Sequence, residues 1–226
     1  MRRGSEIKAQ AILACLFRER QASRAQLAEA LGIRKGTVGA LCAALVADHT
    51  LEAADQGRQR NVRLQLNADR FVGVGMDHHS AGLHITALNA RGEPILDEAF
   101  PLAPASVGGD RLCRIAERTR SLFRREGLKG RVVGIGFSDV GMIDPRRGVA
   151  VRAARLPGWT EMPVQAALVK AASRPVVLLT KVEAACLADG IGRGESGKET
   201  RLYVTLDRGV GAGVVRGGAV WRGDSE

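Results

Sequence analysis

Cysteines are few in this chain of 226 residues, and the four that occur lie far apart. They stand at positions 15, 42, 113 and 186. Because no two are close in the sequence, a disulfide framework and a clustered zinc site are both excluded as interpretations. Their neighbours are largely apolar, so we expect all four to be buried as small hydrophobic side chains.

Long hydrophobic runs are also missing, although 45% of the residues are apolar. A membrane-spanning helix needs about 18 or more consecutive apolar residues, and no such run occurs. The opening MRRGSEIKAQ holds no apolar block of the kind that a secretory signal requires. The sequence therefore predicts a cytoplasmic protein with no membrane partner, large enough for one large or two modest domains.

Positive charge is abundant and unevenly placed. The net charge is +10, and residues 1–70 hold 12 Lys and Arg against 7 Asp and Glu. The remaining excess is spread along the chain without a cluster. A concentration of positive charge in the first third of the chain indicates a polyanionic partner.

Residues 23–45, SRAQLAEALGIRKGTVGALCAAL, predict two short helices joined by a tight turn. Ser23 suits the N-cap of the first helix, and Gly32 suits a left-handed residue that ends it. The second helix then begins on the cationic run Arg34–Thr37. Its apolar stripe, at steps of three and four, consists of Val38, Leu41, Cys42 and Leu45.

This helix pair has the pattern of a helix-turn-helix, in which the first turn of the second helix reaches base edges and phosphates in the DNA major groove. The alternative is an ordinary helical hairpin in a core, with a solvated helix start. A third helix over 5–20 and a strand hairpin over 49–66 flank the pair and favour a winged helix-turn-helix over residues 1–69. The hairpin tip QGRQRN (56–61) is either a phosphate or minor-groove contact or only an exposed charged turn. The predicted DNA-contacting residues are Ser23, Arg34, Lys35, Gly36, Thr37, Arg58 and Arg60.

The chain changes character after the predicted seam at residues 67–70. Period-two patterning predicts strands in 71–76 and 82–102, with a turn at Arg91–Gly92. An amphipathic helix is expected over 110–126, followed by a buried strand that runs into a glycine loop over 131–145. Strands mixed with helices predict an α/β domain over residues 70–226.

Five segments of this second part resemble, in order, the motifs of the ROK family of repressors, open reading frames and sugar kinases. The segments are FVGVGMDHHSAGLHITALNARGEPI (71–95), GIGFSDVGMIDPRRGVAV (134–151), RLPGWTEMPV (155–164), PVVLLTKVEAACLADG (175–190) and LYVTLDRGVGAGVVRGGAVWRG (202–223). The resemblance implies an actin-like ATPase (ribonuclease H-like) fold. A winged helix ahead of such a domain is the arrangement of the family's transcription factors.

The catalytic elements that the resemblance implies are altered. A kinase of this family uses an aspartate to accept the sugar hydroxyl proton. Lys181 stands at that position, with Thr180 at the preceding asparagine, and an ammonium group is no base at neutral pH. In the second phosphate loop of the family motif, Asp207–Arg208 stands where the family has Gly-Thr. In the first phosphate loop, residues 77–82 lack the family's paired glycines and its lysine. We therefore predict no enzymatic activity and no cofactor.

The sugar site that the resemblance implies is altered as well, because Arg155 stands at the position of the family's sugar-contacting asparagine. The family's remaining sugar ligands, its zinc-binding cysteine cluster and its dimerisation helices would lie beyond residue 223, so the resemblance implies an incomplete second subdomain. We predict either a positively charged pocket for a sugar-phosphate or acidic ligand, or a set of drifted surface residues. The predicted ligand-binding residues are Arg155, Thr180 and Lys181.

Two further features invite functional interpretations. The neighbours His78 and His79 suggest a metal, but adjacent strand residues point apart and no third ligand is near, so we predict no metal site. Trp159 is expected at the rim of a cleft between subdomains.

Together these patterns predict a transcriptional regulator, a repressor, that binds double-stranded operator DNA and senses a sugar or sugar-phosphate effector. A homodimer would address two half-sites about one helical turn apart. The alternatives are an ATP-dependent sugar kinase and a shortened remnant that binds no ligand.

Overall fold

A computed structural model of the chain describes residues 3–54, 62–103, 108–125, 127–128, 130–193, 199–206 and 209–223. Its contacts divide the chain into two compact units. The first, here called the N-terminal unit, comprises Met1–Phe71 together with Asn89–Glu93, and the second unit comprises Val72–Leu88 together with Pro94–Glu226. The division lies two residues beyond the predicted boundary, and it adds to the N-terminal unit a turn that the sequence did not assign to it.

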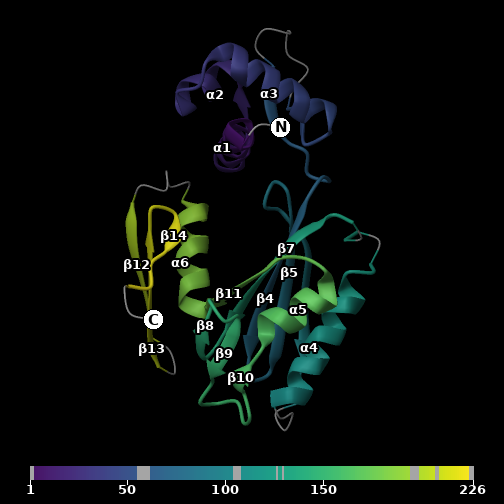
Figure 1. The fold of residues 1–226 in the computed structure, drawn as a ribbon, viewed down its shortest axis with the longest axis vertical. Coiled ribbons are helices and arrows are strands. Elements are labelled where there is room, and N and C mark those ends of the chain that lie inside the picture. The colour runs from purple at the N-terminus through teal and green to yellow at the C-terminus, as the bar shows by residue number, and fades with distance from the viewer. Residues whose placement is uncertain are drawn as a thin grey trace. The chain divides into compact units, whose positions relative to one another are not determined.

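The N-terminal unit contains three helices and a small antiparallel sheet (Figure 1). The helices are α1 (Arg3–Glu19), α2 (Arg24–Leu31) and α3 (Lys35–Ala47). The strands are β1 (Ala22–Ser23), β2 (Leu51–Ala53) and β3 (Arg63–Leu66), in the order β1-β3-β2. The three helices and the β2–β3 pair confirm the predicted elements, whereas the two-residue strand β1 was not predicted.

Local sequence signals set both ends of α2. The Ser23 hydroxyl accepts a hydrogen bond from the Gln26 amide at 3.2 Å, and the Gln26 side chain accepts one from the Ser23 amide at 2.8 Å. This reciprocal capping box satisfies two amides that the helix start leaves free. At the other end Gly32 has φ +62°, a left-handed conformation that glycine adopts without a Cβ clash. Both predictions for α2 are confirmed.

One apolar cluster holds the N-terminal unit together. It contains Ile12 and Leu16 of α1, and Leu27 of α2, each at most 1% exposed. The α3 residues that complete it are Val38, Leu41 and Cys42. The opposite face of α3 is therefore the face left to solvent.

The second unit is built on a five-stranded sheet in the order β11-β7-β4-β5-β6. Its strands are β4 (Val72–His79), β5 (Gly82–Asn89), β6 (Pro94–Pro101), β7 (Val132–Asp139) and β11 (Val176–Thr180). Strands β11, β7 and β4 run parallel, and β6 pairs antiparallel with β5. The predicted mixture of strands and helices is confirmed.

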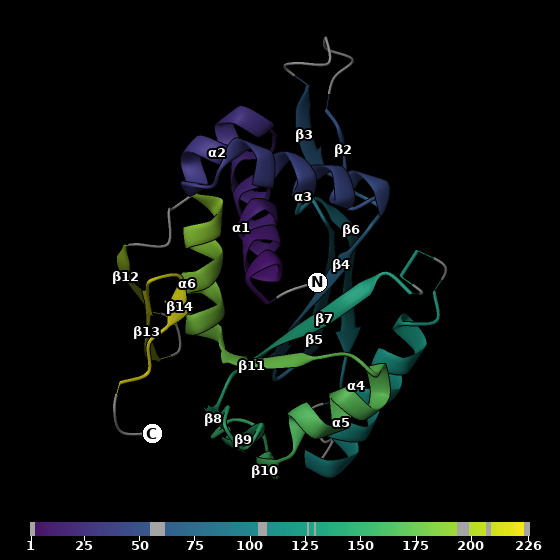
Figure 2. The ribbon, with the colours of Figure 1, turned by 45° about the horizontal axis from the view of Figure 1, so that its top comes forward.

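Helices α4 (Gly108–Leu122) and α5 (Val164–Ala172) lie side by side against this sheet in two views (Figures 1 and 2). Helix α4 ends four residues before the predicted end, but it buries the predicted face, including Leu112, Ile115 and Leu122. Cys113 is exposed, so the expectation that all four cysteines are buried is wrong for this one. It follows Leu112 directly and therefore points about 100° away from the buried stripe.

Smaller elements complete the second unit. Strands β8 (Met142–Asp144), β9 (Val149–Arg152) and β10 (Thr160–Met162) form one three-stranded sheet. Helix α6 (Lys181–Gly192) packs on another, formed by β12 (Thr200–Leu206), β13 (Val210–Arg216) and β14 (Ala219–Val220). Within the described part of the chain, no helix has the length and apolar character needed to cross a membrane.

The contact between α6 and β13 is close enough to require glycine. A Cβ on Gly213 would lie 2.7 Å from the Val182 carbonyl oxygen and 2.9 Å from its carbon, both backbone atoms. We expect Gly213→Ala to lower the free energy of unfolding by about 1–3 kcal/mol, because the backbone must move to admit the methyl group. Urea unfolding measures this change. Gly136→Ala is the matched control, since no atom lies within 4 Å of its Cβ; equal losses in the two variants would contradict the close packing.

Candidate functional site

The first turn of α3 carries the predicted DNA-contacting residues, and it faces solvent. Arg34 is the N-cap residue of α3, and Arg34, Lys35 and Gly36 are all exposed. Thr37 is half-buried, because Val38 beside it is fully buried in the cluster below. The described geometry therefore leaves both cations free to approach a partner.

Ser23 has the structural role that the sequence predicts for it, the N-cap of α2. Its hydroxyl is engaged in the capping box of α2, and its backbone pairs with Arg63 in the small sheet. The other two predicted contacts, Arg58 and Arg60, lie outside the described residues. The exposed surface of α3 also includes Ala40 and Ala43, two small residues that the sequence analysis did not single out.

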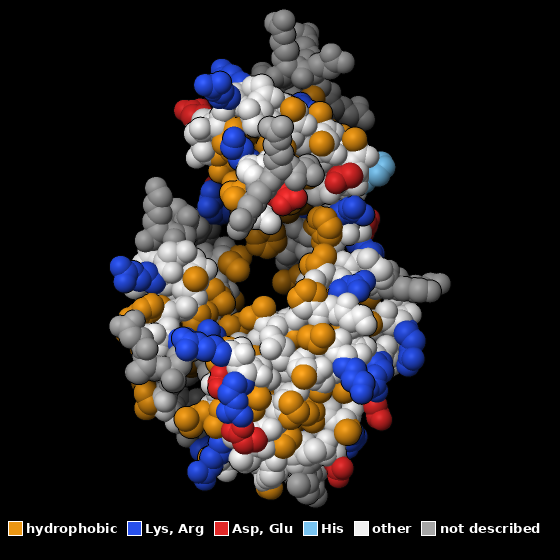
Figure 3. Space-filling view, in the orientation of Figure 1, with side chains coloured by type: hydrophobic (Ala, Val, Ile, Leu, Met, Phe, Trp, Pro, Cys, Tyr) orange, Lys and Arg blue, Asp and Glu red, His pale blue; other side chains and the backbone are white. Residues whose placement is uncertain are grey.

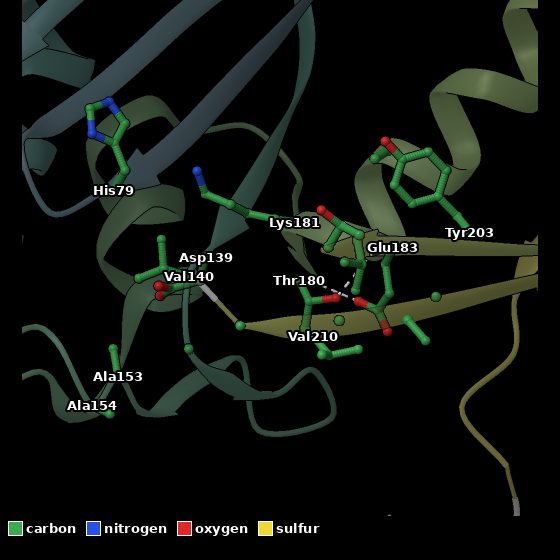
Figure 4. A pocket seen from close by; sticks show the side chains of 18 of the residues that line it. His79, Asp139, Val140, Ala153, Ala154, Thr180, Lys181, Glu183, Tyr203 and Val210 are labelled. Carbon is green, nitrogen blue, oxygen red and sulfur yellow. Dashed lines mark hydrogen bonds between the residues drawn. The ribbon is translucent and has the colours of Figure 1, made fainter. Parts of the chain in front are cut away.

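The second unit contains a cavity of about 1320 Å³. Its walls come from the end of β4 and the turn after it, the end of β7, residues 153–156, the start of α6, and the β12–β13 sheet (Figure 4). Arg155, Thr180 and Lys181, which the sequence analysis grouped as a ligand site, all line this one cavity. The cavity thus brings together residues from six separate stretches of the chain, the last of which is Trp221–Gly223.

Thr180 and Lys181 each already have a structural partner. Thr180 caps α6: its hydroxyl accepts from the Glu183 amide at 3.3 Å, and the Glu183 carboxylate accepts from the Thr180 amide at 2.8 Å. The Lys181 ammonium group donates to the Asp77 carboxylate at 2.9 Å. Asp77 accepts a second hydrogen bond, from the Ser138 hydroxyl at 2.6 Å. The positive charge of Lys181 is therefore balanced at its own position.

A second ion pair, between Glu183 and Arg222, also lines the cavity. The Arg222 guanidinium donates to both oxygens of Glu183, at 2.7 and 3.2 Å. Glu183 and Arg222 are 39 residues apart, and no pattern in the sequence predicted either as a site residue. Figure 3 likewise shows acidic side chains beside basic ones on the face of the second unit that it displays. Charged side chains of both signs therefore lie in pairs around the cavity, which is not a purely cationic pocket.

Buried polar side chains lie beneath one end of the cavity. His78 is fully buried, and its Nε2 accepts a hydrogen bond from Arg111 Nε at 2.8 Å. Because Nε2 is an acceptor there, the proton of the neutral ring sits on Nδ1, which lies 3.3 Å from Asp139 Oδ1. The Trp159 indole donates to the other Asp139 oxygen at 2.9 Å. These contacts give each oxygen of the buried Asp139 carboxyl group a polar partner.

One prediction is corrected by this network. Trp159 is fully buried in the main core, not at the rim of a cleft, because its indole N–H has a buried partner in Asp139. Arg111 is 1% exposed, and burial lowers the pKa of its guanidinium group. The network links His78, Arg111, Asp139 and Trp159, which only the fold brings together.

The two adjacent histidines point in different directions, as the strand pattern predicts. His78 is buried, whereas His79 lines the cavity (Figure 4). Among the residues that the structure describes, no group of three or more His, Cys, Asp or Glu side chains could hold a metal ion.

Comparison with known proteins places this geometry in a family. Residues 117–225 match the model of the ROK family. The chain is 26% identical over 224 residues to a putative xylose repressor of Caldicellulosiruptor sp. (strain Rt8B.4), a match that covers 94% of this chain and 54% of that protein. A stretch of the chain thus matches the ROK family domain, and the chain spans about half the length of this relative.

Solved structures give the fold. A ROK family transcriptional regulator, described as a homolog of the E. coli MLC protein, superposes with a TM-score of 0.74 at 19% identity over 96% of this chain and 57% of that one. The ROK hexokinase from Thermus thermophilus superposes with a TM-score of 0.55 at 30% identity over 68% of this chain and 50% of that one. The second unit thus has the actin-like ATPase fold that these regulators and sugar kinases share.

The titration of His79 tests the charges placed around the cavity. Burial and the positive charge of Lys181 lower the pKa of His79, whereas the carboxylate of Asp77 raises it. We therefore expect the imidazole to protonate below its usual pH range. Lys181→Met should raise this pKa and Asp77→Asn should lower it, as measured by NMR titration of the histidine ring protons. Shifts of the same sign in both variants would contradict the arrangement.

Proposed function

We propose that this chain is a DNA-binding transcriptional regulator, a repressor, whose N-terminal unit is a winged helix-turn-helix with α3 as the recognition helix. The observation that carries the proposal is the solvent-exposed first turn of α3, with Arg34 and Lys35 on it. The relative named as a putative xylose repressor and the structural likeness to a regulator support the same assignment.

The electrostatics of this helix end suit a phosphate backbone. The first turn of α3 holds no acidic residue, so nothing there offsets Arg34, Lys35 or the positive end of the helix dipole. Helix N-termini bind phosphate through their free amides. No atom lies within 4 Å of a Cβ placed on Gly36 or Gly39, so this face offers little steric bulk to an approaching duplex.

The second unit is proposed as a sensor for a sugar or sugar-phosphate effector. The cavity is large enough for such a ligand, and hydrogen-bonding groups from several walls converge on it. Arg155, Thr180 and Lys181 would contact the effector, with Lys181 exchanging part of its interaction with Asp77 for the ligand. The name of the xylose repressor relative makes D-xylose the first probe to use.

The proposed sensor is non-catalytic. The carboxylate that the family resemblance places at residue 181 is replaced by an ammonium group, and that group is bound to Asp77. A sugar kinase remains the second candidate, favoured by the likeness to a ROK hexokinase.

DNA binding is tested by a salt titration with the duplex upstream of the chain's own gene. We expect Arg34→Ala combined with Lys35→Ala to weaken binding by roughly tenfold or more and to reduce the slope of log K against log salt by about 2, because two phosphate contacts are lost. The control, Arg120→Ala with Arg124→Ala, removes two exposed charges of the second unit. Equal weakening by the two double variants, or none by either, would refute the proposed recognition helix.

The kinase candidate is tested by following ADP release with ATP, Mg²⁺ and either D-xylose or D-glucose. We expect no sugar-dependent ADP release, since Lys181 cannot take the hydroxyl proton while it is protonated and paired. Sugar-dependent turnover that is lost in Lys181→Met would establish the kinase instead.

A further inference from the structure

The turn between β5 and β6 belongs to a different unit from the strands that it joins. Strands β5 and β6 lie in the second unit up to Leu88 and again from Pro94, whereas Asn89–Glu93 belongs to the N-terminal unit. The chain consequently passes from one unit to the other three times, at 71–72, 88–89 and 93–94. A single linker would have left the units connected at one point only.

This turn is rigid by its own hydrogen bonds. The Asn89 side-chain oxygen accepts from the Arg91 amide at 2.9 Å and from the Glu93 amide at 3.1 Å. The backbones of Asn89 and Glu93 also pair, at 2.9 Å, and Gly92 adopts φ +77° to close the turn. A segment fixed in this way moves as one piece.

Arg91 anchors the turn within the N-terminal unit. Its Nε donates to the Leu66 carbonyl of β3 at 3.0 Å, and its guanidinium forms an ion pair with Glu52 of β2. Arg20, the residue that follows α1, donates a hydrogen bond to the Arg91 carbonyl oxygen. The backbone of Arg20 is left-handed, with φ +67°. One turn therefore contacts the residue that follows α1 and both strands of the hairpin that follows α3.

The residues just before the other end of β5 line the cavity. His79, the last residue of β4, and Ser80 and Ala81, which link β4 to β5, are part of the cavity wall. Arg111 fixes this link by donating to the carbonyls of His79 and Ser80, at 2.5 and 3.0 Å. Strand β5 itself is eight residues, about 26 Å long, and it is held in the core by three apolar side chains. These are Leu83, Ile85 and Ala87, each at most 1% exposed.

We propose that the β5–β6 hairpin transmits the state of the cavity to the N-terminal unit, with Arg91 as the residue that couples the two. A change at the cavity end displaces a strand that cannot bend within the core, and the strand carries the turn with it. The turn then acts on β2 and β3 through Glu52 and Leu66. The proposal concerns movement within this chain, so its test needs neither DNA nor an identified effector.

The test uses a substitution in the cavity wall as its probe. Ser80→Trp adds a bulky side chain at the cavity end of the hairpin, at an exposed position that interrupts no core packing. Hydrogen exchange of the full chain is then measured at Ala90–Glu93 and in β2 and β3. We expect exchange there to change by about threefold or more relative to the unsubstituted chain, because the anchoring bonds are strained. Val177→Trp, on an exposed site of β11 outside the hairpin, is the matched control and should leave these amides unchanged.

Removal of Arg91 tests the coupling itself. In the Arg91→Ala background, Ser80→Trp should no longer alter exchange in β2 and β3. Arg91→Lys, which keeps the charge beside Glu52 but loses the fork that also reaches Leu66, should give an intermediate response and serves if Arg91→Ala unfolds the N-terminal unit. An unchanged exchange pattern after Ser80→Trp, or the same response with and without Arg91, would overturn the proposal. Failure of the chain to bind DNA would not contradict this proposal, because the proposal is tested by hydrogen exchange alone.

Discussion

The apolar face of α3 determines what the N-terminal unit can present to a partner. Val38, Leu41 and Cys42 are buried in the apolar cluster of the unit, where α3 packs against α2 and β2, and this packing fixes the rotation of α3 about its own axis. The cap at Ser23 and the left-handed Gly32 fix the direction in which α3 leaves α2. With both settled, the first turn of α3 has to face solvent. The proposed recognition of DNA depends on this constraint more than on the number of basic residues.

The second unit depends on a buried carboxylate in a comparable way. A polar group in the interior is tolerated when it is hydrogen-bonded, and the Asp139 carboxyl group has His78 and Trp159 as partners. This network ties the end of β4 to the end of β7 at the floor of the cavity. The ion pairs of Lys181 and Arg222 then shape the wall above it. A cavity lined by this many hydrogen-bonding and charged side chains is suited to binding a polar ligand. This supports the proposed sensor.

Local signals in the sequence predicted much of the fold. The capping residues of α2, the apolar stripe of α3 and the buried face of α4 all follow from spacing along the chain, because each depends on neighbours within one or two helical turns. Cys113 was misjudged because its neighbours in sequence lie on another face of α4. Trp159 and Arg111 were missed as partners because their contacts are with Asp139 and His78, which no local pattern brings near. The same holds for Arg91, whose role depends on where the β5–β6 turn folds back. Arg155, Thr180 and Lys181 were grouped through family motifs, whereas the carboxylate neighbour of Lys181, Asp77, comes from long-range pairing.

The central claim, that the first turn of α3 meets DNA, is tested most directly by amide chemical shifts during titration of the full chain with its upstream duplex. The account predicts that the largest changes fall on Arg34–Val38, with α4 and α5 left unperturbed. Changes confined to the second unit, or an absence of change at the start of α3 while the complex forms, would contradict it.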